Sequence, residues 1–120
     1  MVFIGGGLGS LCRYGIANRL SAYSASFPYG TLTANVLSSL ILGFITGLIM
    51  QEVEFISNEI KLLIAVGFCG GFSTYSTFTN ETFQLLQGGN WTLAFANVVS
   101  NLLVCLLAIF LGMWISKIIL

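Results

Sequence analysis

The sequence predicts an all-α membrane protein with four transmembrane helices and a break in the third. The chain has 120 residues, of which 57% are hydrophobic and only 7% are charged. A soluble domain usually carries about a quarter charged residues, so this chain cannot cover a water-facing surface. Two uncharged stretches of more than 30 residues separate Arg19 from Glu52 and Glu81 from Lys117. Since a span needs about 20 apolar residues, each stretch can hold at least one.

Turn residues divide the chain into its four spans. Pro28 and Gly30 mark the turn before the second span, and the glycines at 88 and 89 mark the turn before the fourth. The short loops make neighbouring helices antiparallel. No secretory signal peptide is expected, because the early apolar stretch contains four glycines and is followed by Arg13. We expect the spans at residues 2–22, 30–50, 58–86 and 91–118.

The few positive charges do not favour one orientation in the membrane. With both chain ends on one side, Arg13 and Arg19 lie towards the opposite side, whereas Lys61 and Lys117 lie towards the side of the ends. Two charges against two leave almost no positive-inside bias. This balance permits insertion in both orientations and hence an antiparallel dimer.

Paired glycines predict close helix contacts in the first two spans. Gly5 with Gly9, and Gly43 with Gly47, have the four-residue spacing that lets two backbones approach closely. The contacts belong either to packing within one subunit or to a dimer face.

The segment GFCGGFSTYSTFTNE at 67–81 is poor material for a continuous span. Each glycine at 70 and 71 costs a helix about 1 kcal/mol relative to alanine. The hydroxyls that follow can bond to backbone groups released by a break. A broken span offers carbonyls to a cation and an N–H end to an anion. The alternative is a tight helix crossing with hydroxyls bonded to their own helix.

Aromatic rings and amides accompany this segment. Tyr75 and Phe78 share a helix face, and ring edges can face a desolvated anion. Asn35 lies in the second span, and Asn97 and Asn101 share a face of the fourth. Amides at membrane depth are costly unless they pair across helices or line a wet cavity. Helix packing and a polar pathway both remain open from these residues alone.

The residue inventory excludes most enzyme chemistry. With neither histidine nor aspartate, the chain cannot assemble the usual catalytic bases, triads or metal sites. Cys12, Cys69 and Cys105 lie in apolar surroundings, which predicts buried thiols rather than disulfides or a metal site. No nucleic-acid partner is expected.

Three motifs in order resemble the Fluc/CrcB family of fluoride channels, and the resemblance covers essentially the whole chain. The motifs are Gly6-x-x-Gly9-Ser10-x-x-Arg13-Tyr14, Gly30-Thr31-Leu32-x-x-Asn35-x-x-Ser38-x-x-x-x-Gly43 and Gly67-Phe-Cys-Gly70-Gly71-x-Ser73-Thr74-x-Ser76-Thr77-Phe78. The resemblance implies a dual-topology, antiparallel dimer in the plasma membrane through which fluoride leaves the cytoplasm passively. It also implies a structural sodium ion held by the backbone carbonyls of Gly70 and Ser73.

The resemblance also implies roles for side chains along the fluoride path. Asn35 corresponds to a donor at the pore, and Tyr75 and Phe78 correspond to two phenylalanines whose edges line it. Ser76 and Thr77 correspond to a hydroxyl track, and Arg13 corresponds to a fixed charge that attracts anions near the vestibule.

This chain departs from the family pattern at several of these positions. Tyr75 stands where the family has phenylalanine, Ser73 replaces a threonine, and Asn97 and Asn101 align with a tyrosine and a serine. Such changes keep open a heterodimer with a paralogous subunit, in which one pore is impaired, beside the homodimer. Two further functions compete with a channel: a small multidrug-resistance-type exporter and a non-transporting helper subunit. The exporter would need a carboxylate in the first span, which has none.

Overall fold

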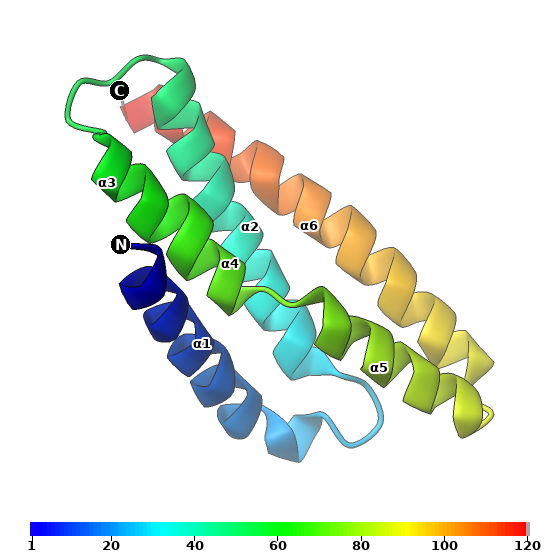
Figure 1. The fold of residues 1–120 in the computed structure, drawn as a ribbon. Coiled ribbons are helices and arrows are strands. Elements are labelled where there is room, and N and C mark those ends of the chain that lie inside the picture. The colour runs from blue at the N-terminus through cyan, green and yellow to red at the C-terminus, as the bar shows by residue number, and fades with distance from the viewer. Residues whose placement is uncertain (120) are drawn as a thin grey trace.

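A computed structural model describes residues 1–119 as a bundle of long helices with short connections (Figure 1). The chain runs along α1, returns along α2, and alternates again through α3–α5 and α6, so both ends lie toward the same end of the bundle. No strand occurs within 1–119, and the prediction of an all-α chain is confirmed. The elements are α1 (Val2–Arg19), the 3₁₀ turn η1 (Ser21–Tyr23), α2 (Tyr29–Met50), α3 (Asn58–Ile60), the π-helical segment η2 (Lys61–Phe68), α4 (Cys69–Phe72), α5 (Tyr75–Gln87) and α6 (Trp91–Ile119).

Three helical stretches of the described chain are long and apolar enough to cross a membrane. They are Tyr29–Met50, Asn58–Gln87 and Trp91–Ile119. The first helix, Val2–Arg19, is not among them, although its 18 residues give a length of about 27 Å. Five glycines and two arginines make it less apolar than the other three helices. The longest dimension of the molecule is 51 Å, which exceeds the thickness of a bilayer with its headgroups, about 40–45 Å.

Small residues bring α2 and α6 into close contact along their length. A Cβ atom at Gly43 would strike the backbone of Ile109, and one at Gly112 would strike the carbonyl of Leu40. Each helix therefore contributes a glycine where the other helix's backbone passes. This is the small-residue packing that membrane helices use to gain van der Waals contact.

The α1 helix packs in the same way against the first half of the third span. A Cβ at Gly5 would strike the Leu63 carbonyl of η2, and one at Gly9 would strike the Phe68 carbonyl. Both predicted glycine pairs, including Gly43 with Gly47, thus serve packing within one chain.

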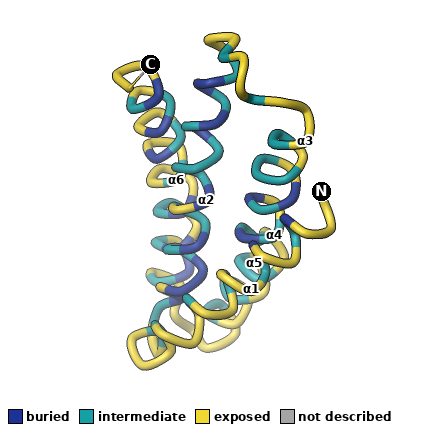
Figure 2. Tube along the Cα trace, turned by 90° about the vertical axis from the view of Figure 1, so that its left-hand side faces the viewer, coloured by how far each residue is buried: buried dark blue, intermediate teal, exposed yellow. Residues whose placement is uncertain are grey.

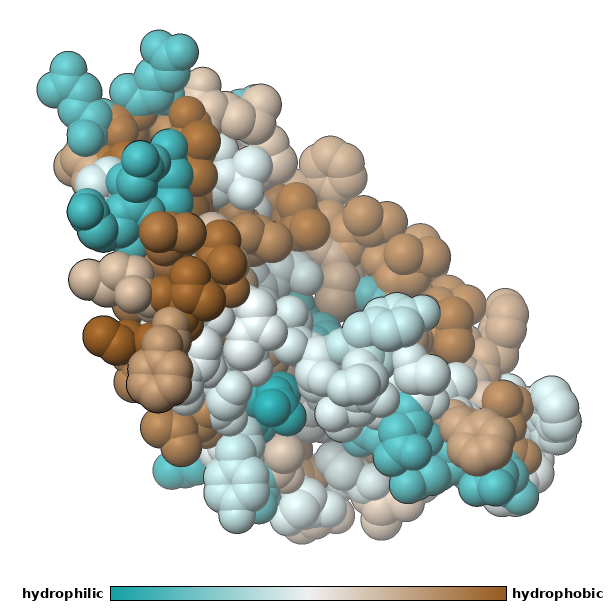
Figure 3. All heavy atoms as spheres, viewed as in Figure 1, coloured by the Kyte–Doolittle hydropathy of each residue, from teal (hydrophilic) through white to brown (hydrophobic). Residues whose placement is uncertain are grey.

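Burial in this chain is the reverse of that in a soluble protein. Small and polar side chains such as Ser38, Asn97 and Ser116 are buried, whereas large apolar side chains such as Phe95 and Phe110 point outward. Figure 2 shows the buried residues where helices face one another and exposed ones on the outer faces. Figure 3 shows hydrophobic surface along α6 and beside α1, with a paler band over α4 and α5 and hydrophilic residues toward the ends. Such a surface fits lipid.

Candidate functional site

The third span is interrupted at Ser73 and Thr74, two residues beyond the glycines. Both residues have extended backbones, with φ −88° and ψ 154° at Ser73 and φ −150° and ψ 126° at Thr74. Gly70 and Gly71, which the sequence indicated as the weak point of this span, lie inside α4 and do not themselves form the break. Gly71 instead lets α4 approach α1, because a Cβ there would strike the Gly6 carbonyl.

Side chains donate to two carbonyls of α4, those of Cys69 and Gly71. The Cys69 carbonyl accepts from the Ser73 N–H at 3.0 Å, the Ser73 hydroxyl at 2.9 Å and the Ser38 hydroxyl at 3.0 Å. Arg13 Nε donates to the Gly71 carbonyl at 3.1 Å. A helix end needs such partners where no water is present.

Thr74 and Asn35 shape the start of α5. Thr74 is the N-cap residue, and its Oγ1 accepts from the Thr77 N–H at 3.4 Å. The Thr74 N–H donates to Asn35 Oδ1 at 3.1 Å. Because this N–H would otherwise bond the Gly70 carbonyl four residues back, Asn35 competes directly with continuation of the helix.

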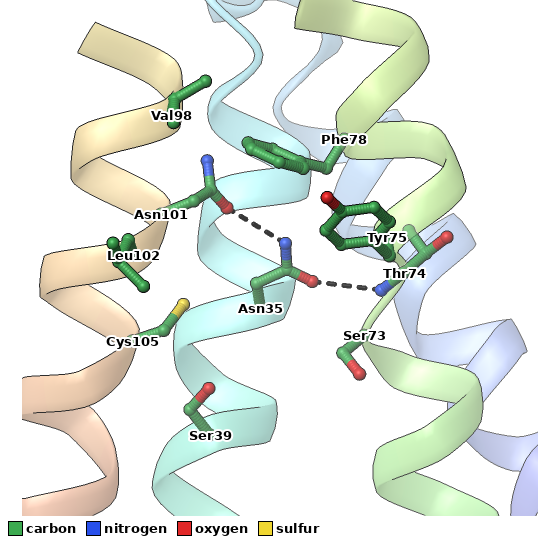
Figure 4. A pocket seen from close by; sticks show the side chains of 10 residues that line it. All are labelled: Asn35, Ser39, Ser73, Thr74, Tyr75, Phe78, Val98, Asn101, Leu102 and Cys105. Atoms are coloured by element: carbon green, nitrogen blue, oxygen red, sulfur yellow. Dashed lines mark hydrogen bonds between the residues drawn. The ribbon is translucent and has the colours of Figure 1, made fainter. Parts of the chain in front are cut away.

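A pocket of about 410 Å³ opens beside the break, between α2, α5 and α6 (Figure 4). Amides, hydroxyls, rings, aliphatic groups and a thiol line it, and none of them carries a fixed charge. The lining residues are Asn35, Ser39, Ser73, Thr74, Tyr75, Phe78, Val98, Asn101, Leu102 and Cys105.

Two aromatic rings stand over the amides in this pocket. The ring centroids of Tyr75 and Phe78 are 5.7 Å apart and their planes meet at 55°. Figure 4 shows both rings on the same side of Asn35. The Tyr75 side chain is 80% exposed, and Phe78 is half-buried. The rings therefore leave part of the pocket open to whatever surrounds the single chain.

Three amides join the pocket to the interior. Asn35 Nδ2 donates to Asn101 Oδ1 at 3.0 Å, and Asn101 Nδ2 donates to both Oδ1 and the backbone carbonyl of Asn97 at 2.9 Å. Asn97 Nδ2 then donates to Thr82 Oγ1 at 2.8 Å. With 7% of Asn101 and 1% of Asn97 exposed, these amides link helices as well as the pocket wall.

Several of the predicted site residues lie off the pocket wall. Ser76 is exposed near the Thr74 hydroxyl, and Thr77 stands on the cap of α5. Arg13 lies on the α1 side, at the end of α4, and Gly70 is exposed on α4. Asn97 is buried behind Asn101. The pocket unites the other five predicted residues, which are Asn35, Ser73, Tyr75, Phe78 and Asn101.

Ser39, Thr74 and Cys105 also line the pocket, although the sequence did not indicate them as site residues. Ser39 follows Asn35 by four residues and Cys105 follows Asn101 by four, so one helical turn of spacing could have indicated both. Cys12 is exposed on α1, which corrects the expectation of a buried thiol there, whereas Cys69 is buried.

The pocket can offer donors to an anion without offering a full positive charge. The N-terminal end of α5, the Asn35 amide and the rings of Tyr75 and Phe78 meet there, and an aromatic ring carries a partial positive charge at its edge. Within 1–119, no group of three or more acidic, cysteine or histidine side chains could hold a metal ion. This is the arrangement of a membrane protein with an interrupted helix and, beside the break, an uncharged pocket in which a few polar groups stand among apolar ones.

Comparisons with known proteins give the family. Residues 1–113 match the family described as CrcB-like protein, Camphor Resistance (CrcB). Proteins named fluoride-specific ion channel FluC from Pyrococcus abyssi and Pyrococcus horikoshii are each 47% identical over 117 residues, covering 98% of this chain and 94% of theirs. The protein of that name from Magnetococcus marinus is 40% identical over 119 residues, covering 98% and 96%. The chain belongs to the CrcB family.

Proposed function

We propose that the chain is a passive, fluoride-selective channel, which lets fluoride leave the cytoplasm and so protects the cell from fluoride toxicity. The observation that carries the proposal is the neutral pocket at the start of α5, where Asn35, Tyr75 and Phe78 meet. Fluoride is small and strongly hydrated, so a pore must replace its water with several weak donors without trapping it. The names of the relatives support the same function.

We further propose that α1 is a fourth span and that two chains pair antiparallel in the plasma membrane. The pocket lies on the surface of the single chain, with Tyr75 and the pocket residue Leu102 largely exposed. A second copy that covers this face would enclose the pathway. The balance of two positive charges near each end allows the two orientations that such a dimer needs. A paralogous subunit could cover the face in the same way.

A structural sodium ion at the break fits the backbone carbonyl oxygens that are present there. The Gly70 carbonyl is without its usual helical donor because the Thr74 N–H bonds Asn35. Gly70 is also exposed and has open space around its α-carbon. Carbonyls of unwound membrane helices are suitable sodium ligands. The carbonyls of Gly70 and Ser73 would hold the ion, which would fasten the broken helices of two chains together.

A proton-coupled exporter is the less favoured function. An exporter of the small multidrug-resistance type needs a carboxylate in its first span, and α1 contains no acidic residue. The carboxylate nearest the site along α5, Glu81, lines a separate pocket that includes Ser24 and Gln84. The first span therefore lacks the carboxylate that such an exporter uses, and Glu81 is not in the pocket beside the break.

Growth of a fluoride-sensitive bacterial strain that lacks its own exporter tests the proposed function. The chain should restore growth in fluoride, whereas Asn35→Ala and Phe78→Ala should not, because each removes a group from the anion path. All three proteins should be present in the membrane as dimers by cross-linking. Failure of the unaltered chain to restore growth would contradict a self-sufficient channel. Loss of dimers in both variants would indicate a helper subunit whose polar residues only hold helices together.

A further inference from the structure

The amides of Asn35, Asn101 and Asn97 form one chain of hydrogen bonds, here called the amide relay, whose direction is fixed at both ends. At its start, the Thr74 N–H points to Asn35 at 3.1 Å. A backbone N–H can only donate, so it requires the oxygen of Asn35 on its side. The nitrogen of Asn35 must then face Asn101, whose oxygen accepts from it at 3.0 Å.

The far end of the relay imposes the same direction. Asn101 Nδ2 lies 2.9 Å from the backbone carbonyl of Asn97, and a carbonyl can only accept. Asn101 therefore cannot flip without placing its oxygen against that carbonyl. Because neither terminal group can reverse its role, the amide assignment follows from the network and not from a choice between two equal rotamers.

The relay continues beyond the amides and returns to the helix on which it began. Asn97 Nδ2 donates to Thr82 Oγ1 at 2.8 Å, and Thr82 Oγ1 donates to the Phe78 carbonyl at 2.8 Å. The path thus leaves α5 at Thr74, crosses α2 and α6, and ends one turn into α5. It ties the second half of the broken span to two other helices.

Neither Asn101 nor Asn97 offers a donor to an anion in the pocket. The two hydrogens of Asn101 Nδ2 are accounted for by the two oxygens of Asn97. Asn97 is only 1% exposed and lies off the pocket wall. Asn35 differs from both. One N–H of its side-chain amide donates to Asn101, and the second N–H is available to a ligand in the pocket, because Asn35 lines the pocket.

We propose that Asn101 and Asn97 are positioning residues, which hold the Asn35 amide with its nitrogen, not its oxygen, available to the pocket. The part of this inference that concerns anion passage rests on the proposed function. A flipped Asn35 would present a partial negative charge to the ion. Together with the Thr74 N–H, the two asparagines of α6 therefore set the sign of the charge that the pocket presents, and they do so through Asn35.

Nuclear magnetic resonance of the full chain, ¹⁵N-labelled in detergent micelles, tests the relay without any reference to transport. The side-chain amide signals of Asn35 are assigned by their loss in Asn35→Ala. Asn101→Ala should shift these signals and speed exchange of the Asn35 amide protons with water about tenfold. Asn97→Ala should also shift them, although Asn97 does not touch Asn35. Ser116→Ala, also on α6, is the control and should leave them unchanged, because the Ser116 hydroxyl bonds the Met113 carbonyl and Gln51 and no residue of the relay.

Thr82→Val removes the last two hydrogen bonds of the path, those that join Asn97 to the Phe78 carbonyl through the Thr82 hydroxyl, and leaves the three amides in place. It should shift the Asn97 side-chain signals, whereas Thr79→Val, which removes a hydroxyl bonded in the same way to the Tyr75 carbonyl, should not. If either asparagine variant fails to fold, this pair of threonine variants still tests whether the relay exists. Asn35 signals that stay fixed in Asn101→Ala, or equal effects of the two threonine variants, would overturn the relay.

Fluoride release from liposomes then tests the positioning role. If Asn101 and Asn97 act in series, each alanine variant should release fluoride at least about fivefold more slowly, and the double variant should match the slower single variant within about twofold. Losses that multiply in the double variant would overturn the positioning role in favour of independent contributions. Absence of release from the unaltered chain would instead contradict the proposed function, and the resonance experiment alone would decide the relay.

Discussion

Asn35 connects the broken helix to the rest of the bundle. The sequence indicated this residue as a polar group at membrane depth that needs a hydrogen-bond partner. It could not show that the partner would be the Thr74 N–H, because that contact joins residues 39 apart and exists only after α2 and α5 have packed. For the same reason the spacing of Asn97 and Asn101 showed a shared face but not which of them reaches the pocket.

Arg13 gives a prediction at the level of one residue. Its guanidinium donates to the Gly71 carbonyl at the end of α4, and hydrogen bonds from charged groups contribute about 1.5–3 kcal/mol. Arg13→Gln should therefore lower the free energy of unfolding in detergent by about 2 kcal/mol. Arg19→Gln, at an exposed position of the same helix, should change it by less than about 0.5 kcal/mol. If both variants lose the same free energy of unfolding, the positive charge of Arg13 and not its hydrogen bond to Gly71 accounts for its effect.

The interruption of the third span shows what local sequence can and cannot predict about an element. Glycines and hydroxyl residues correctly indicated weak helix between residues 67 and 81. The break itself lies at Ser73 and Thr74, because those residues have the side chains to cap both helix ends. Glycine at 71 serves packing against α1, which depends on the partner backbone and is invisible in the local sequence.

Packing of α1 against the third span gives a prediction at the level of elements. Gly5→Ala would push a methyl group against the Leu63 carbonyl, so the helices must separate, at a cost of about 1–3 kcal/mol. Gly7→Ala, on the same helix, meets no atom within 4 Å and should be neutral or stabilising by up to about 1 kcal/mol. Unfolding in a denaturant series measures both. A Gly5→Ala chain as stable as Gly7→Ala would contradict the close contact.

The molecule as a whole shows an apolar exterior around a small polar interior. That distribution was predictable from composition, since eight charged residues cannot cover a chain of this size. Composition could not predict that the pocket would lie on the surface of one chain, because this depends on how α5 is displaced from α4 by the break. The pairing of two chains and the binding of a sodium ion remain predictions at this scale.

Removal of sodium should weaken the proposed dimer. If the carbonyls of Gly70 and Ser73 hold the ion, sodium-free buffer leaves them unsatisfied in an apolar interface. Single-molecule counting of labelled chains in liposomes should then show dissociation at chain densities where sodium maintains dimers. Re-addition of sodium should restore the dimer, and choline at the same concentration is the control. Dimerisation that is the same in both salts would exclude a structural sodium ion.

Conduction should be nearly independent of pH between 6 and 8. The pocket contains no histidine, carboxylate or amine, and Glu81 lines a different pocket. Histidine is the side chain whose charge ordinarily changes between pH 6 and 8, and the pocket lining contains none. Fluoride release measured at half-unit steps of pH should vary by less than about twofold. A steep change would indicate proton coupling and favour a carrier.

The most direct measurement is ion release from liposomes that contain this chain alone, followed in parallel with fluoride and chloride electrodes. A neutral pocket with the donor of Asn35 and the rings of Tyr75 and Phe78 should pass fluoride rapidly and exclude chloride. We predict fast fluoride release and no chloride release, which would establish a selective channel formed by one kind of chain. Release of neither ion would contradict a self-sufficient channel and indicate a subunit that requires a paralogous partner.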